Sequence, residues 1–231
     1  MLLGFSTGSL AKGDFQTALA MLEGHEVSTV ELSALREEEL LGLLKALSSL
    51  KLEKYRHISL HAPSALHDIS ELELVELLLP LELPVVLHPD VIQDWECWKS
   101  LGSLLLIENM DKRKPVGRTS RELETIFQRL PDARLCLDVG HSKQIDPSLH
   151  ESKKILREHG DRLAEIHLSE VNSASRHERL NRTAIEEFQQ LARYIPPGIP
   201  IILETPVSAN EIEQELARAR EVFAVRELAL S

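Results

Sequence analysis

One pattern recurs along the whole sequence: a short apolar run ends in a polar residue, and a stretch with helical spacing of apolar residues follows. The polar ends lie roughly 30 residues apart, which is the length of one parallel βα unit. The eight runs are Leu2–Ser6, Val27–Leu32, His57–His61, Val85–His88, Leu104–Glu108, Arg134–Asp138, Leu163–His167 and Ile199–Glu204. The pattern therefore predicts eight consecutive βα units.

Alternating strands and helices predict an α/β protein with a parallel sheet. The chain has 231 residues and no Pro/Gly-rich linker, so we expect residues 1–231 to form one domain. Eight units in one domain favour a single (β/α)8 TIM barrel. An open doubly wound sheet is the alternative, but the segment from Gly4 to Gly8 lacks the G-x-G-x-x-G loop that often follows the first strand of such sheets.

Helix starts can be recognised between the runs. Three Ser/Thr-x-x-Glu capping boxes begin at Thr119, Thr183 and Ser208, each ahead of an amphipathic stretch. The segment Arg36–Leu50 places leucines three and four residues apart behind an acidic first turn, which is typical of a helix packed on one face. These signals predict helices where a barrel requires them.

Composition excludes several classes of protein. The formal net charge is −11, with 26 Lys and Arg against 37 Asp and Glu, which argues against a broad nucleic-acid surface. Two cysteines do not make a disulfide scaffold and favour a reducing compartment. No uncharged apolar run approaches the roughly 20 residues of a membrane span, and the first residues lack the basic segment of a secretory signal. We therefore expect a cytoplasmic protein without a membrane segment.

Seven of the eight runs end in a carboxylate or an imidazole. These residues are Glu31, His61, His88, Glu108, Asp138, His167 and Glu204. In a barrel, the carboxyl ends of all strands meet at one mouth. Clustered carboxylates repel one another unless a cation compensates them, and this mixture of oxygen and nitrogen donors suits a divalent ion such as Zn²⁺, Mn²⁺ or Fe²⁺, with Mg²⁺ also considered. The sequence therefore predicts a divalent metal site at the mouth.

Further candidate residues lie close to these strand ends. His141 follows Asp138 by three residues, so both side chains can face the mouth, and His177 lies on the loop after the seventh run. Glu31 and Arg176 are candidate substrate contacts. The basic stretch 112–114 is either a solvated loop or a contact to a substrate phosphate.

The chain resembles the xylose isomerase-like TIM barrel superfamily along its whole length. The segments that carry the resemblance read ISLHAPS, VVLHPD, LLIENMD, LCLDVGHS, IHLSEVN and IILETP. In the sugar phosphate isomerase and epimerase branch, the resemblance implies one metal ion held by Glu108, Asp138, His167 and Glu204. It also implies that the two glutamates act as the catalytic acid/base pair.

The endonuclease IV-like branch of the superfamily adds ligands for further metal ions. The resemblance assigns these imidazoles to His61, His88, His141 and His177, which form either a second metal site or contacts to substrate. Ser175 stands where this branch has a carboxylate, so one ligand of a trinuclear site is replaced.

Three hypotheses follow. The first is a metal-dependent isomerase or epimerase of a small sugar or sugar phosphate, in which His61 and His88 contact the substrate rather than a second ion. The alternative is an endonuclease IV-like multinuclear phosphoester hydrolase. The third is a barrel that binds metal or ligand without catalysis. We expect a small-molecule sugar or sugar-phosphate substrate in preference to a nucleic acid, which stays open as the substrate of the hydrolase alternative.

Overall fold

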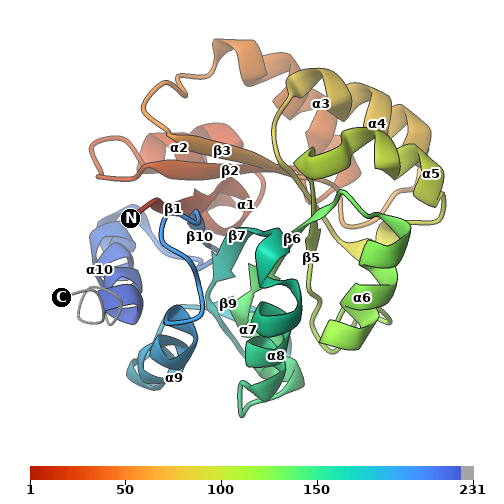
Figure 1. Cartoon of the computed structure of the whole chain (residues 1–231). Helices are drawn as coiled ribbons and strands as arrows, with labels where there is room; N and C mark the ends of the chain where they lie inside the picture. Colours follow the sequence, from red (N-terminus) through yellow and green to blue (C-terminus); the bar gives the residue numbers. More distant parts are fainter. Residues whose placement is uncertain (225–231) are drawn as a thin grey trace.

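Eight parallel strands close into a barrel in the computed structural model, which describes residues 1–224 (Figure 1). Around the barrel, the strands follow one another in the order β1-β10-β7-β6-β5-β4-β3-β2. They are β1 Leu3–Ser6, β2 Thr29–Ser33, β3 His57–His61, β4 Val85–Leu87, β5 Leu105–Glu108, β6 Arg134–Asp138, β7 Leu163–Leu168 and β10 Ile201–Leu203. The predicted (β/α)8 TIM barrel is therefore confirmed, and the open doubly wound sheet is excluded.

Helices lie around the outside of the strands (Figure 1). The α-helices are α1 Thr7–Ala11, α2 Phe15–Met21, α3 Glu37–Ala46, α4 Glu71–Leu78, α5 Trp95–Trp98, α6 Ser120–Arg129, α7 Val139–Ile145, α8 His150–His159, α9 Arg182–Ala192 and α10 Ile212–Phe223. Short 3₁₀ helices are η1 Leu47–Ser49, η2 Leu79–Leu81, η3 Pro89–Val91, η4 Lys99–Leu104, η5 Gly160–Arg162 and η6 Ala209–Glu211. A two-stranded antiparallel hairpin, β8 Glu170–Val171 with β9 His177–Glu178, follows β7.

Alternation along the strands separates two environments. Residues that point outward pack against the helices in a large aliphatic core. Inside the barrel, Val86, Leu106 and Cys136 form a separate apolar cluster. Because side chains alternate along a strand, the residue two positions further on also points inward. Glu108 and Asp138 follow the last two of these residues at that spacing, so the barrel interior changes from apolar to polar toward the mouth.

Close packing of the first two strands depends on a glycine. A Cβ atom at Gly4 would lie 1.8 Å from the carbonyl oxygen of Thr29, so β1 and β2 could not pair as they do with any other residue there.

The second strand continues beyond the predicted end of its run, to Ser33. Glu31 is therefore an interior residue of β2 rather than its last residue.

The helix starts agree with the capping predictions in part. Ser208 forms the predicted reciprocal capping box with Glu211. The Thr119 hydroxyl caps α6, but the carboxylate of Glu122 accepts from the backbone N–H of Arg118 instead of completing the box. For α9 the prediction at Thr183 is wrong. The helix begins two residues earlier, because the side chain of Asn181 accepts from the N–H of Ala184 and caps it.

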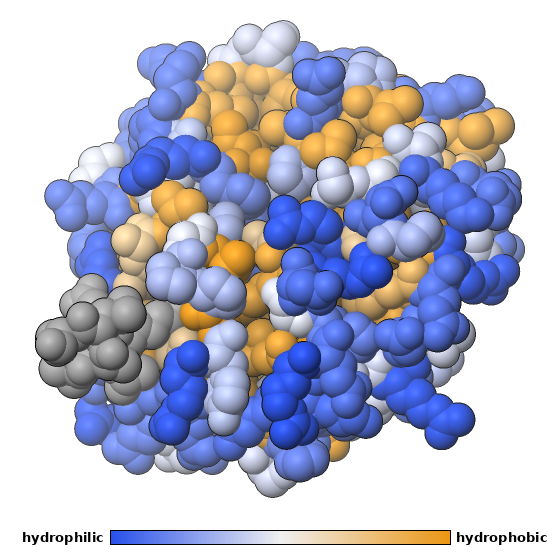
Figure 2. All heavy atoms as spheres, viewed as in Figure 1, coloured by the Kyte–Doolittle hydropathy of each residue, from blue (hydrophilic) through white to orange (hydrophobic). Residues whose placement is uncertain are grey.

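Polar side chains dominate the face of the molecule in Figure 2, but apolar ones gather in the upper part of the view, where Figure 1 places α3 and α4. Leu41 and Leu72 on these helices are each more than half exposed.

Within residues 1–224, none of the helices combines the length and apolar character needed to cross a membrane.

Glu71, at the start of α4, joins this helix to the next βα connection. Its carboxylate accepts the indole N–H of Trp98 at 2.6 Å and the backbone N–H groups of Gln93 and Asp94. Glu71→Ala leaves these donors without a partner, so we expect the free energy of unfolding to fall by about 1–3 kcal/mol. Urea denaturation measures this loss, and Glu76→Ala, on the exposed side of the same helix, is the matched control. Equal stability of the two variants would contradict this role.

Candidate functional site

The polar strand-end residues meet at the mouth of the barrel around Glu108. The carboxylate of Glu108 is only 1% exposed and is surrounded by four imidazoles. These belong to His61, His88, His141 and His167, which come from β3, the residue after β4, α7 and β7. The topology of the barrel thus brings together side chains that are far apart in the sequence.

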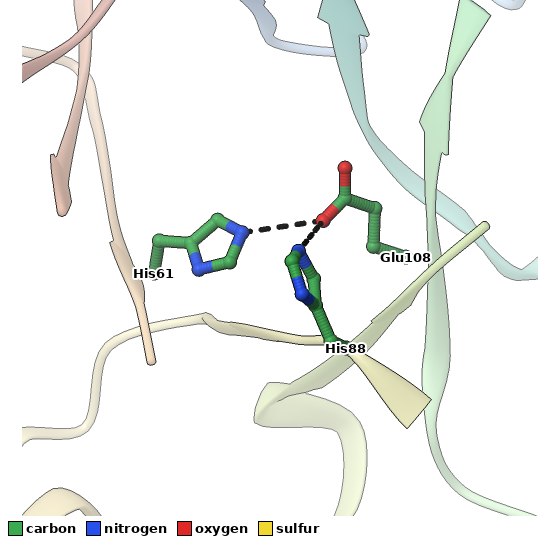
Figure 3. Close-up of side chains that lie close together, drawn as sticks. All are labelled: His61, His88 and Glu108. Atoms are coloured by element: carbon green, nitrogen blue, oxygen red, sulfur yellow. Dashed lines mark hydrogen bonds and ion pairs between the residues drawn. The ribbon is translucent and has the colours of Figure 1, made fainter. Parts of the chain in front are cut away.

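One oxygen of Glu108 faces two of these histidines. Figure 3 shows His61 and His88 pointing toward the same carboxylate oxygen, with Nε2–Oε2 distances of 3.2 and 3.0 Å. The Nδ1–H of His61 donates to the carbonyl oxygen of Ala62 at 2.8 Å, which fixes the ring so that Nε2 faces Glu108. The two rings are almost perpendicular, with centroids 4.9 Å apart. These three residues form a compact group of donors, which we call the first ligand group.

The other oxygen of Glu108 faces a second group of donors. Oε1 lies 3.4 Å from Nδ1 of His167, and the same nitrogen lies 3.6 Å from Oε2 of Glu204. With Asp138, these residues offer four donor atoms that all lie within 4.8 Å of one another. We call Glu108, Asp138, His167 and Glu204 the second ligand group. The structure thus brings together the four residues that the resemblance assigned to one metal ion.

Asp138 is the last residue of β6 and the N-cap of α7, and its two carboxylate oxygens have different surroundings. Its Oδ1 accepts the backbone N–H of His141 at 2.6 Å and caps the helix. Oδ2 remains directed toward the site. The helix can start here only because residue 140 is glycine: a Cβ atom at Gly140 would lie 2.5 Å from Val171 and 2.7 Å from the carbonyl oxygen of Ser169. This local geometry explains why the carboxylate and the imidazole three residues later share the mouth.

A third group of donors consists of Asp138, His141 and His177. The Ser175 hydroxyl, which takes the place of a carboxylate in the resemblance, donates to Oε1 of Gln144 at 2.8 Å. It is therefore engaged with Gln144 on α7, and this third group keeps only one carboxylate.

Two candidate substrate contacts differ in their surroundings. Glu31 is fully buried below the mouth, where its Oε2 lies 3.1 Å from Nε2 of His167 and its Oε1 accepts from the Ser33 hydroxyl. Arg176 is exposed on the hairpin after β7, where its backbone N–H donates to Asn172. Only Glu31 therefore contacts a residue of the second ligand group.

Sequence reasoning missed three polar residues around the site. Asn109 accepts the backbone N–H of Asp138 and donates to its carbonyl oxygen, so it locks the ends of β5 and β6 together. Asp111, 1% exposed, lies 4.0 Å from Nε2 of His141 and accepts from Arg113. Glu165 precedes His167 by two residues on the inward face of β7 and was a further signal in the sequence.

Burial and neighbouring charges act in opposite directions on the two glutamates of the second ligand group. Burial by itself would raise the pKa of Glu108, but the imidazoles around it, His88 first, hold that pKa well below its usual value. Burial raises the pKa of Glu204 well above its usual value, against the effect of His167, and the nearby carboxylate of Asp138 raises it further. The two glutamates of the second ligand group therefore differ in acidity, with the pKa of Glu108 lowered and that of Glu204 raised.

The second ligand group fits a divalent metal ion. Among the described residues, three buried donor atoms of this group have no hydrogen-bond partner: Asp138 Oδ2, His167 Nδ1 and Glu204 Oε2. Buried polar atoms without partners are costly, and a cation at their centre would satisfy all three at once. Carboxylate oxygens and imidazole nitrogens are suitable ligands for such an ion.

The metal-free protein is expected to lose stability as the pH rises above neutrality. Burial opposes protonation of His141, but the carboxylates of Asp138 and Glu108 raise its pKa from 6.5 to about 10. Because the folded-state pKa is the higher one, the stabilisation is fully present below pH 6.5 and is lost as the pH rises toward 10. Urea denaturation with a chelator at several pH values measures the effect. His141→Gln should show a flatter dependence, and stability that rises over this range would contradict the assignment.

The chain is a (β/α)8 barrel whose mouth gathers the imidazoles and carboxylates that could hold a metal ion. More particularly, the chain has the fold of the xylose isomerase-like TIM barrels, which confirms the resemblance at the level of the fold.

Three solved structures illustrate this similarity. Endonuclease IV from Thermus thermophilus is 20% identical, with 97% of this chain and 99% of that chain covered and a TM-score of 0.62. A xylose isomerase domain protein from Alicyclobacillus acidocaldarius is 12% identical, with 97% and 98% covered and a TM-score of 0.62. The 3-keto-D-glucoside 4-epimerase YcjR from E. coli is 11% identical, with 98% and 99% covered and a TM-score of 0.58. No protein-family model matches the sequence, and no curated protein matches it.

Proposed function

We propose that this protein is an enzyme, a metal-dependent phosphoester hydrolase that binds at least two divalent ions sharing Glu108. The observation that carries the proposal is the division of the Glu108 carboxylate. Its Oε2 faces His61 and His88, while its Oε1 faces His167. A carboxylate that presents one oxygen to each of two donor groups is suited to bridge two ions.

The two ligand groups use different residues apart from this shared carboxylate. In the proposal, one ion is held by His61, His88 and Glu108, and the other by the second ligand group. Two ions held by these residues would supply Lewis-acid chemistry for the hydrolysis of a phosphate ester. The isomerase hypothesis assigns His61 and His88 to substrate instead, but their Nε2 atoms both contact Glu108. This contact favours the hydrolase over our first hypothesis from the sequence.

Arg113 is the residue that we propose as the cationic contact for the substrate. The buried carboxylate of Asp111, 4.0 Å from Nε2 of His141, accepts hydrogen bonds from the backbone N–H and the guanidinium of Arg113, so it fixes the middle residue of the basic stretch 112–114. The side chain of Arg113 remains 57% exposed. In the proposal, this guanidinium binds an oxygen of the substrate phosphate.

The substrate class that we propose is a small phosphoester. The net charge of −11 disfavours a long nucleic acid, whose binding needs many cationic contacts. Because one similar structure is named endonuclease IV, a nucleic-acid phosphodiester is the alternative substrate to test.

Two measurements test this proposal together. Elemental analysis of protein purified without added metal is expected to give about two or more ions per chain. The same protein should hydrolyse bis(p-nitrophenyl) phosphate, lose this activity with a chelator and regain it with Zn²⁺ or Mn²⁺. Nicking of a supercoiled plasmid tests the nucleic-acid alternative. One ion per chain with no hydrolysis of either substrate would contradict the proposal.

A second candidate function is a metal-dependent isomerase or epimerase of a small sugar or sugar phosphate. It is favoured by the opposite pKa shifts of Glu108, which is lowered, and Glu204, which is raised, both close to His167, because proton transfer next to a carbonyl needs one group as base and one as acid. This candidate predicts one ion per chain and exchange of a substrate proton with deuterium from D₂O. Metal-dependent exchange without phosphoester hydrolysis would select it.

A further inference from the structure

A polar layer lies below the second ligand group, deeper in the barrel. Its central residue is Glu165 on β7, which is 0% exposed. An irregularity in the pairing of β6 with β7 aligns Cys136 with Glu165 and Asp138 with His167, so Glu165 points inward directly beneath His167. Neither proposed ligand group includes Glu165.

Hydrogen bonds from two histidines converge on the Glu165 carboxylate. The Nε2–H of His167 donates to Oε1 at 3.2 Å, and the Nε2–H of His57 donates to Oε2 at 2.5 Å. His57 begins β3, at the opposite end of that strand from His61, and its side chain is 16% exposed. A chain of contacts therefore runs through the barrel from the amino-terminal end of β3 to the mouth.

The two nitrogens of His167 face different groups. Nδ1 points to the mouth, 3.4 Å from Glu108 and 3.6 Å from Glu204, and has no hydrogen-bond partner among the described residues. Nε2 faces the acceptors Glu165 and Glu31 at 3.2 and 3.1 Å. Since both groups beside Nε2 are carboxylates, the ring keeps a proton there. The lone pair of a neutral ring is then on Nδ1, directed into the second ligand group.

Glu165 is the better partner of Nε2 for two reasons. Its contact with His167 meets hydrogen-bond geometry, whereas Oε2 of Glu31 has no hydrogen-bond partner in the described part of the chain. Glu165 also accepts a direct hydrogen bond from a second imidazole, that of His57, which compensates its charge. The second imidazole that acts on the charge of Glu31, that of His61, does so without a hydrogen bond among the described residues, where the other oxygen of Glu31 accepts from the Ser33 hydroxyl. A buried carboxylate is stable only with such compensation.

We propose that Glu165 is a positioning residue for the metal site, held in place by His57, and that it fixes the ring of His167 so that Nδ1 binds the ion. The inference rests on the metal centre of the proposed function. A carboxylate behind a metal-binding imidazole fixes its tautomer and orientation and increases its basicity as a ligand.

Zinc affinity of four variants tests this role. Competition with a chromophoric chelator should give Zn²⁺ binding that is roughly 10- to 100-fold weaker in Glu165→Ala. Glu165→Gln should lie between Ala and wild type, since the amide oxygen still accepts from Nε2–H but carries no charge. His57→Ala, which touches no proposed ligand, should weaken binding by a smaller factor. Thr29→Val is the control, because this buried residue is the register partner of His57 and its hydroxyl donates to Ile201.

Ring nitrogen NMR of the metal-free protein gives a readout that does not depend on zinc. In wild type, Nε2–H of His167 should be protected from exchange with solvent, with the resonance assigned through His167→Gln. The protection should be lost in Glu165→Ala and weakened in His57→Ala, while Thr29→Val should retain it.

The outcomes separate this inference from the proposed function. If wild type binds no zinc, the proposed function fails, and loss of the protected His167 proton in Glu165→Ala still supports the positioning role. If folded Glu165→Ala and His57→Ala bind zinc as tightly as Thr29→Val does, Glu165 only forms a structural ion pair, and the inference is overturned. If Glu165→Ala does not fold, the comparison of His57→Ala with Thr29→Val still decides the question, because His57 is partly exposed and its replacement is easier to accommodate.

Discussion

Glu108→Gln is expected to remove both proposed metal ions or leave at most one, and to abolish phosphoester hydrolysis. Glutamine has the same shape but cannot bridge two cations, and it no longer compensates the charge of the imidazoles around it. Removing one partner from a buried charged set costs about 3–5 kcal/mol, so metal affinity is expected to fall by roughly 10²- to 10⁴-fold. Elemental analysis and chelator competition measure the loss.

The control for this prediction is Glu76→Gln, which neutralises an exposed carboxylate on α4. Circular dichroism of both variants shows whether each one folds. Full metal content and unchanged hydrolysis in folded Glu108→Gln would refute the central role of this carboxylate.

His61→Ala combined with His88→Ala is expected to remove one equivalent of metal and leave the other. Both imidazoles face Oε2 of Glu108, whereas Asp138 and His167 in the second ligand group are untouched. Because a two-metal hydrolase needs both ions, hydrolysis should fall on the order of 10²-fold or more.

The matched control for the double variant is His67→Ala combined with His150→Ala, which removes two exposed histidines. Unchanged metal content in His61→Ala/His88→Ala, together with weaker binding of a sugar substrate, would favour the isomerase instead. The experiment therefore separates the two functions that share this mouth.

The barrel could be predicted from the sequence because its signals are local. A repeat of an apolar run, a polar end and a helical stretch is visible in any window of about 30 residues. Once the barrel is accepted, its topology alone brings the strand ends to one mouth. The convergence of His61, Glu108 and His167 therefore followed from the sequence, as their observed contacts confirm.

Local signals failed where several residues could do the same task. Both Asn181 and Thr183 are suitable helix caps, and only the packed structure selects Asn181. The end of β2 was placed too early because Ser33, although polar, continues the pairing with β3. As a consequence, Glu31 lies beneath His167 rather than at the end of its strand.

The barrel and the kinds of side chain at its mouth can be predicted from the amino-acid sequence, because strand alternation and residue type are properties of neighbouring positions. The folded chain was needed to see how the Glu108 oxygens are divided between histidines on different strands. It also revealed the contact between His57 and Glu165, which are 108 residues apart along the chain. Such contacts depend on the register of strands and the rotamers of buried side chains, which are set by packing across the whole barrel and not by any local segment.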